Sequence, residues 1–141
     1  MKIYTMNEGS FEVPEEWKDN SLNIFVVGGS EPPMNLSFVI SRDTLRDGVE
    51  LVDYVEKQLG DVGKKLRKFR VIGKRQIEVN GHPALEAEFT WISDKSPMHQ
   101  RQQYIRRGTT VLVFTATAPV KIEDEHIEQI DALLRSVRFN V

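Results

Sequence analysis

Three histidines are the residues of this chain best suited to acid–base chemistry or metal binding, and they lie at positions 82, 99 and 126. They fall in separate segments, and their spacing is not that of metal ligands. A general acid or base also needs a partner within hydrogen-bond reach, and the pattern provides none. We therefore expect His82, His99 and His126 to be surface or capping residues, with no metal site and no cofactor.

One short stretch contains the residue types of a hydrolase triad, namely Ser93, Asp94, Ser96 and His99. A triad is assembled from distant elements, whereas these four residues crowd one turn. The glycines of Gly28–Ser30 likewise lack the lysine and the helix start of a phosphate-binding loop. We therefore predict no catalytic residues and no enzymatic activity.

A basic stripe extends from Lys64 to Arg75, where seven of twelve residues are Lys or Arg and none is acidic. Leu66 and Phe69 are interleaved, so the stripe could contact phosphates. The alternative is a solvated edge strand that its lysines protect from aggregation. The formal charge of the chain is −2, which favours the edge strand and gives no general attraction to nucleic acid or anionic membranes.

Two glutamines are placed near apolar surface. Gln58 shares a helical stripe with Leu51, Val55 and Val62, and Gln102 lies on a predicted strand. Either amide could hydrogen-bond a polar group of a bound apolar helix, where an unmatched group would be costly. The alternative for Gln58 is a glutamine at the border of the apolar stripe.

The scaffold for these residues is predicted to be strands interrupted by two helices. The chain offers short strands at 3–5, 11–13, 22–27 and 34–41, and longer ones at 69–79, 85–91, 100–106 and 110–118. Asn80-Gly81 is a strong hairpin signal, and the GGSEPP stretch after residue 27 cannot continue a strand. The closing helix carries Ile127, Ile130, Leu134 and Val137 on one face.

The first helix is predicted to begin at a capping box formed by Asp47 and Glu50 and to stop at Gly60 or Gly63. Runs of strands with two helices indicate an α+β fold with a mainly antiparallel sheet. We expect both helices to pack on one face of that sheet. The other face would then be left open.

Length and composition bound the remaining alternatives. The 141 residues fit one domain, 1–141, and contain no cysteine. The N-terminus lacks the run of 7–15 apolar residues of a signal peptide, so we expect a cytoplasmic protein. The longest uncharged run, 108–120, is shorter than the ~18 residues that suggest a membrane span, so we expect no stable membrane insertion.

Several motifs together resemble a known family: the short N-terminal hairpin, F-x-V-P-x-x-W at Phe11–Trp17, a capped helix, V-N-G-H-P-A at Val79–Ala84 and the closing amphipathic helix. The chain resembles the DcrB-related, PsbP-like small proteins, and among them the Eag chaperones of bacterial type VI secretion. The resemblance implies a cytoplasmic homodimer that holds the N-terminal transmembrane segments of a toxic effector. It would hold them until the effector is loaded on the secretion spike, so the spike complex would be a partner through the effector.

The segment 22–27 is apolar toward both faces, which raises the question of what its second face covers. If Phe25 and Val27 join the helix-covered core, Leu22 and Ile24 lie on the open face beside Val39. The opposite register would bury Leu22 and Ile24 instead.

The leading hypothesis is a non-enzymatic chaperone that shields transmembrane helices in a groove on the open sheet face. The residues expected to bind this partner are Leu22, Ile24, Val39, Gln58, Leu66 and Gln102. The rival hypothesis is a PsbP-like adaptor that binds a folded protein or nucleic acid through the basic stripe, without catalysis. Salt-sensitive binding would distinguish the rival, because burial of apolar helices survives high salt.

Overall fold

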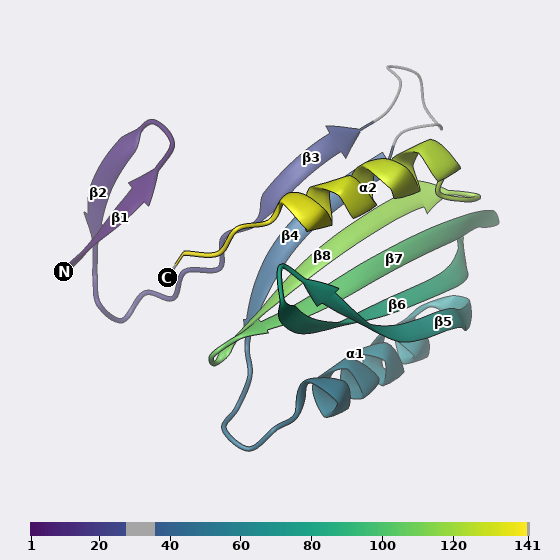
Figure 1. The fold of residues 1–141 in the computed structure, drawn as a ribbon, viewed down its shortest axis with the longest axis horizontal. Coiled ribbons are helices and arrows are strands. Elements are labelled where there is room, and N and C mark those ends of the chain that lie inside the picture. The colour runs from purple at the N-terminus through teal and green to yellow at the C-terminus, as the bar shows by residue number, and fades with distance from the viewer. Residues whose placement is uncertain (28–35, 141) are drawn as a thin grey trace.

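A six-stranded antiparallel sheet in the order β3-β4-β8-β7-β6-β5 forms the body of the protein in this computed structural model (Figure 1). The structure describes residues 1–27 and 36–140. The strands of the sheet are β3 (Asn23–Val27), β4 (Leu36–Thr44), β5 (Arg67–Val79), β6 (His82–Ser93), β7 (Ser96–Arg107) and β8 (Thr110–Pro119). The predicted α+β class with a mainly antiparallel sheet is confirmed. The GGSEPP connection, Met34 and Asn35 lie outside the described residues.

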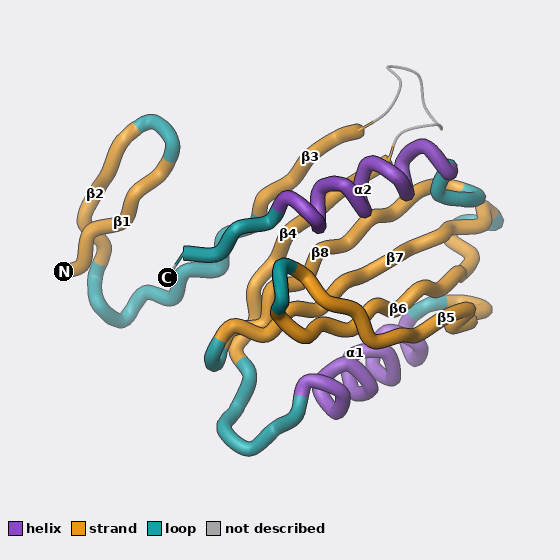
Figure 2. Tube along the Cα trace, viewed as in Figure 1, coloured by secondary structure: helices purple, strands orange, loops and turns teal. Residues whose placement is uncertain are grey.

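A separate two-stranded sheet precedes this body. β1 (Lys2–Met6) and β2 (Gly9–Val13) pair antiparallel with each other and with no other strand of the described chain. Figure 2 shows this hairpin standing beside the main sheet, connected by an extended segment. The predicted N-terminal hairpin is therefore confirmed, but it contributes no residue to either core cluster found in the described chain.

The long hairpin of β5 and β6 turns at Asn80-Gly81, as the sequence predicts. Both turn residues have positive φ, 50° for Asn80 and 79° for Gly81, which suits the tight turn that matches strand twist. β5 lies at one edge of the sheet and has two register shifts against β6. The strand portion of the basic stripe therefore lies at the edge of the sheet, as one of its two interpretations expects.

Helix α1 (Leu51–Lys65) begins later than predicted. Its N-cap is Glu50, and no side-chain hydrogen bond caps it, so the predicted capping box of Asp47 and Glu50 is wrong. Gly48 has a φ of +81°, a left-handed conformation that breaks a helix. The helix can form only after that residue.

Helix α1 also ends later than predicted, at Lys65 rather than at Gly60 or Gly63. A Cβ atom on Gly63 would lie 2.9 Å from Cδ2 of Phe69. The glycine at this position makes room for an aromatic ring that packs against the helix. Its role is close packing, which local sequence rules mistake for a stop signal.

The two helices lie on opposite faces of the sheet, so the expectation that both pack on one face is wrong. Helix α2 (Asp124–Ser136) packs with one core cluster and α1 with the other. The α2-face core contains Leu36, Phe38, Val79, Ala84, Ile105, Phe114, Ala116, Ala118, Ile122, Ile130 and Leu134. The α1-face core contains Leu45, Val55, Leu59, Ala87, Phe89, Tyr104, Val111 and Val113.

The cause of this arrangement is visible in β8, where successive residues point to opposite faces and are apolar on both. Val111 and Val113 belong to the α1-face core, and Phe114 and Ala116 belong to the α2-face core. A strand that is apolar on both faces needs cover on both. Since each helix is narrower than the sheet, each face also keeps a part that its helix does not cover.

Candidate functional site

The register of β3 decides which of its residues face α1. Ile24 pairs with Val39 and Phe25 pairs with Phe38, so the first of the two predicted registers is present. Val27 packs against the α2-face core together with Phe38. Ile24 therefore lies beside Val39 on the face that carries α1.

The part of the α1 face farthest from the helix is uncovered. Helix α1 packs against β5, β6 and part of β7, and the far side of the face lies over β3, β4 and the adjoining parts of β8 and β7. We call this region the open strip, made of Ile24, Val26, Ser37, Val39, Gln100, Gln102, Thr115 and Thr117, all exposed or half-buried. Ile24 and Val26 are 63% and 78% exposed, which is high for large apolar side chains in a strand.

The residues of β8 show how far along the strand α1 covers the sheet. On this face the strand runs Val111, Val113, Thr115 and Thr117, and only the two valines are buried. Buried positions are apolar, and the uncovered ones carry hydroxyl groups. The open strip thus combines apolar strands at the sheet edge with polar side chains near its centre.

Hydrogen bonds hold the polar side chains of the strip in place. The Tyr104 hydroxyl donates to Oε1 of Gln102, and Nε2 of Gln102 donates to Oγ1 of Thr115 at 3.2 Å. Oγ1 of Thr117 donates to Oε1 of Gln100 at 3.1 Å. Burial raises the pKa of Tyr104, so its hydroxyl stays protonated and able to donate.

The other predicted partner-binding residues border the strip to different degrees. Gln58 is half-buried and lies one turn after Tyr54, whose ring contacts Tyr104 edge-on at a centroid distance of 6.3 Å. Leu66 is half-buried and packs against the α1-face core. Leu22 is 53% exposed and lies just before β3. The fold therefore brings Ile24, Val39 and Gln102 onto one face, with Gln58 on the adjoining helix.

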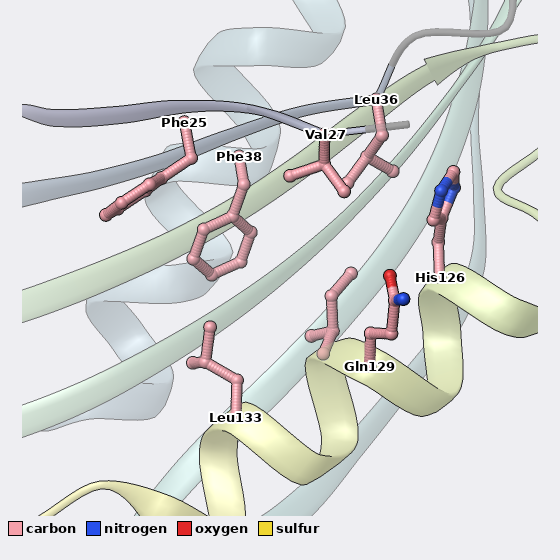
Figure 3. Close-up of a pocket in the computed structure, with 8 residues that line it drawn as sticks. Phe25, Val27, Leu36, Phe38, His126, Gln129 and Leu133 are labelled. Carbon is pink, nitrogen blue, oxygen red and sulfur yellow. The ribbon is translucent and has the colours of Figure 1, made fainter. Parts of the chain in front are cut away.

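The opposite face of β3 borders an apolar pocket of about 240 Å³. Figure 3 shows side chains from β3 and β4 directed toward α2 across this space. The lining residues are Phe25, Val27, Leu36, Phe38, His126, Gln129, Ile130 and Leu133. Phe25 is 54% exposed and Leu133 38%, so the pocket opens at the β3 edge of the molecule.

A buried ionic cluster, which the sequence did not predict, fixes α2 to the sheet. Arg101 is only 4% exposed, and its Nη2 lies 2.9 Å from Oε2 of Glu86 and 3.1 Å from Oδ1 of Asp131 on α2. Gln103 donates to the same Glu86 oxygen, and Arg75 donates to the other at 2.8 Å. The sequence signal that could have indicated this cluster is the alternation of charged and amide residues, Glu86 and Glu88 on β6 and Arg101 and Gln103 on β7.

The electrostatics of Glu86 follow from these contacts. Burial tends to raise the pKa of its carboxyl, but hydrogen bonds from Gln103 and Arg75 and the charge of Arg101 outweigh burial, and the pKa is lowered. The carboxylate is therefore charged and paired. A charged group held this way has a structural role and needs no catalytic one.

The histidines occupy structural positions in three different contexts. His99 is buried, its Nδ1 accepts from the backbone N–H of Ile122 at 2.8 Å, and its Nε2 lies 2.7 Å from Glu88. His82 stacks edge-on against Phe139, and His126 lies at the rim of the α2-face pocket. His99 is only 6% exposed and binds the N–H of Ile122, which lies before the N-cap of α2, so the expectation of a surface or capping residue is wrong for His99.

Residues 1–27 and 36–140 contain neither a metal-binding cluster nor a membrane-spanning helix. No three His, Asp or Glu side chains there gather closely enough to hold a metal ion. Helices α1 and α2 are both too short and too polar to cross a membrane.

Sequence reasoning missed several members of the open strip. Val26, Gln100, Thr115 and Thr117 were not predicted as partner-binding residues, although they share its face. The signal was the alternation of Thr115 and Thr117 with buried Ala116 and Ala118. This alternation indicates an uncovered surface only once the position of α1 on the sheet is known.

Comparison with known proteins shows the family of the chain. The model of the family described as DcrB matches residues 8–136. The chain belongs to the DcrB family. It is also 35% identical over 117 residues to "Effector EagT6" of Pseudomonas aeruginosa, a match that covers 83% of this chain and 81% of that protein. The resemblance stated from the sequence motifs is therefore confirmed.

Solved structures share the fold of this DcrB-family chain. A Pseudomonas aeruginosa protein of unknown function, PA94, matches with a TM-score of 0.85 and 30% identity over 100% of this chain and 98% of that one. The Ran-binding protein Mog1p of Saccharomyces cerevisiae matches with a TM-score of 0.55 and 12% identity over 93% and 82%. At that identity Mog1p shows the common fold alone.

Proposed function

We propose that this DcrB-family protein is a cytoplasmic, homodimeric chaperone and adaptor for a type VI secretion effector. Its task is to shield N-terminal transmembrane helices of the effector from water before the effector is loaded on the secretion spike. The similarity to EagT6 supports the secretion context. The proposed function requires no catalysis and no cofactor.

The observation that carries the proposal is the open strip. Ile24 and Val26 expose large apolar surfaces beside Val39, and Gln102 and Thr115 place amide and hydroxyl groups next to them. A transmembrane helix of ~20 residues is mainly apolar but has some polar groups to satisfy. The strip offers both kinds of contact on one face. Each Å² of apolar helix surface that it buries contributes about 25 cal/mol.

The test is co-purification of a co-expressed effector that carries N-terminal apolar segments. We expect Ile24→Asp to abolish co-purification while circular dichroism shows a folded domain, because Ile24 is 63% exposed. The matched control is Ile72→Asp, on the opposite edge strand, which is 49% exposed and should leave co-purification unchanged.

A core variant calibrates the folding measurement. Phe38 is 3% exposed, so Phe38→Asp should unfold the domain, since an unpaired buried carboxylate costs several kcal/mol against a total stability of about 5–15 kcal/mol. An Ile24→Asp protein that remains folded and still holds the effector would show that the open strip is not the binding surface.

A further inference from the structure

Two Gln–Thr pairs lie next to each other on the open strip, and their hydrogen bonds run in opposite directions. Across β7 and β8, Gln102 is paired with Thr115, and Gln100 with Thr117. In the first pair, Nε2 of Gln102 donates to Oγ1 of Thr115 at 3.2 Å. In the second pair, Oγ1 of Thr117 donates to Oε1 of Gln100 at 3.1 Å. The two amides are therefore turned in opposite senses, although the residue types and the strand pairing are the same.

The Tyr104 hydroxyl accounts for this difference. Tyr104 follows Gln102 by two residues on β7, so both side chains point to the α1 face. The hydroxyl donates to Oε1 of Gln102, which holds the oxygen end of the amide toward Tyr104 and turns the nitrogen end toward Thr115. Gln100 lies four residues from Tyr104, about 13 Å along the strand, which is too far for the same contact.

Tyr104 can hold the amide because it is itself fixed. Its side chain is 2% exposed, and its ring contacts Tyr54 edge-on at a centroid distance of 6.3 Å. A buried hydroxyl hydrogen needs an acceptor inside the protein, and Oε1 of Gln102 provides one. Burial raises the pKa of Tyr104, so the hydroxyl keeps this hydrogen. Reversal of the amide would place the hydrogen against an NH₂ group, which cannot accept it.

We propose that Tyr104 is a positioning residue, which orients Gln102 so that the open strip recognises hydrogen-bond acceptors on a bound apolar helix. Thr115 takes one N–H of the Gln102 amide, and the amide has a second. Thr115 also keeps its own hydroxyl hydrogen, because its oxygen is the acceptor in this pair. Both groups are donors at half-buried positions of the strip. A serine or threonine oxygen of the helix, or a carbonyl that a kink leaves free, would satisfy them.

This inference deepens the proposed function and rests on it. Apolar contacts with Ile24, Val26 and Val39 favour any apolar helix, because the hydrophobic effect is non-directional. Hydrogen bonds depend on direction, and a donor left unpaired in apolar surroundings is costly. The oriented amide would therefore select, among apolar helices, those that direct an acceptor toward β7.

The experiment compares synthetic helices that differ by a single acceptor atom. The probes are lysine-flanked leucine–alanine peptides of ~20 residues that carry either O-methylserine or norvaline near the centre. These two side chains have similar shapes, but only O-methylserine has an oxygen. Placing the residue at each of four successive positions covers one helical turn. Fluorescence anisotropy with the full-length protein gives the acceptor preference, which is the Kd of the norvaline peptide divided by that of the O-methylserine peptide.

The acceptor preference should fall in Tyr104→Phe, which keeps the ring and removes the hydroxyl. We expect a decrease of about fivefold, the effect of one ordinary hydrogen bond. Tyr54→Phe is the matched control, because its hydroxyl donates to Asp43 at 2.6 Å and the preference should not change. Gln102→Leu should lower the preference by the same factor as Tyr104→Phe. The double variant should then equal Gln102→Leu, since Tyr104 acts through Gln102.

The outcomes distinguish the inference from the proposed function. An acceptor preference that is equal in the unmodified protein, Tyr104→Phe and Gln102→Leu would overturn the inference and leave the chaperone function standing. A Tyr104→Phe effect that persists in the Gln102→Leu background would overturn it as well. So would loss of folding in Tyr104→Phe by circular dichroism, because the hydroxyl would then stabilise the domain rather than orient the amide. Failure of the proposed function shows instead as unchanged effector capture by Ile24→Asp.

Discussion

Glu86 shows how single residues of this protein combine burial with charge. Its carboxylate is 7% exposed and receives hydrogen bonds from Gln103 and Arg75, beside the buried guanidinium of Arg101. Removing one partner from such a cluster leaves the others buried and unpaired, at a cost of about 3–5 kcal/mol. We regard the cluster as the main polar link between α2 and the sheet.

The lowered pKa of Glu86 makes a prediction about acid stability. A carboxyl whose folded-state pKa lies below its ordinary value of 4.5 contributes stability above that value and loses it as the pH falls through the folded-state pKa. We expect the free energy of unfolding of the unmodified protein to fall as the pH drops below 4.5. In Glu86→Gln, already less stable at pH 7, this part of the pH dependence should be absent. Urea titrations at several pH values measure it, and parallel curves for the two proteins would contradict it.

Residue identity alone did not reveal this cluster. Arg101 and Gln103 look like the polar, solvent-facing positions of a half-buried strand, and alternation gives no sign that a helix covers them. The same alternation left two registers open for Ile24, and the pairing with Val39 decided which face it occupies. Partners distant in sequence, such as Asp131, were needed to identify the buried charges.

Among the elements, α1 is the one whose ends the sequence misplaces, and its two glycines have different surroundings. A Cβ atom on Gly60 would meet no atom within 4 Å, whereas one on Gly63 would lie 2.9 Å from the ring of Phe69. Gly60 therefore costs helix stability without a packing benefit. Gly63 has a packing benefit that offsets the same cost.

We predict that Gly60→Ala stabilises the protein by about 0.5–1 kcal/mol, the helix propensity difference between the two residues. Gly63→Ala should give no gain or a loss, because the Phe69 ring, which packs at 5.0 Å from Phe89, would have to move. Thermal unfolding of the pair measures the difference. Equal stabilisation by both substitutions would show that Phe69 moves freely.

The basic edge gives a second prediction at this scale. Replacing Lys64, Lys65, Arg67 and Lys68 with glutamine should leave effector co-purification largely intact at low and high salt, because exposed charges contribute little compared with apolar burial. All four side chains are exposed. Loss of binding, or strong salt sensitivity of the unmodified complex, would favour the adaptor hypothesis that uses this stripe.

At the scale of the whole molecule, the N-terminal hairpin is separate from both cores. β1 and β2 contribute to neither core cluster. Large apolar side chains of this region are accordingly exposed, Ile3 in β1 to 73% and Trp17 after β2 to 62%. An isolated two-stranded hairpin is marginally stable on its own. Its stability here rests on contacts with the following segment, such as the hydrogen bond between Tyr4 and Ser21 at 2.6 Å.

We therefore predict that deleting residues 1–13 leaves the six-stranded sheet folded, with cooperative thermal unfolding and a midpoint within a few degrees of that of the full chain. Differential scanning calorimetry or circular dichroism measures this. The matched comparison is deletion of 124–141, which removes Ile130 and Leu134 from the α2-face core and should abolish cooperative unfolding. If deletion of the hairpin also unfolds the six-stranded sheet, the N-terminal hairpin stabilises that sheet and the prediction is wrong.

The sequence by itself determined the element order, the Asn80-Gly81 hairpin, the antiparallel class and the family motifs, because turn chemistry and strand alternation are local properties. It also left two possible registers for β3. Only the tertiary structure decided between them, through the pairing of Ile24 with Val39 and Phe25 with Phe38. It likewise decided that α1 and α2 lie on opposite faces, since a strand such as β8, apolar on both sides, does not specify which helix covers which side. The open strip depends on that choice, because it is the part of one face that its helix is too narrow to cover.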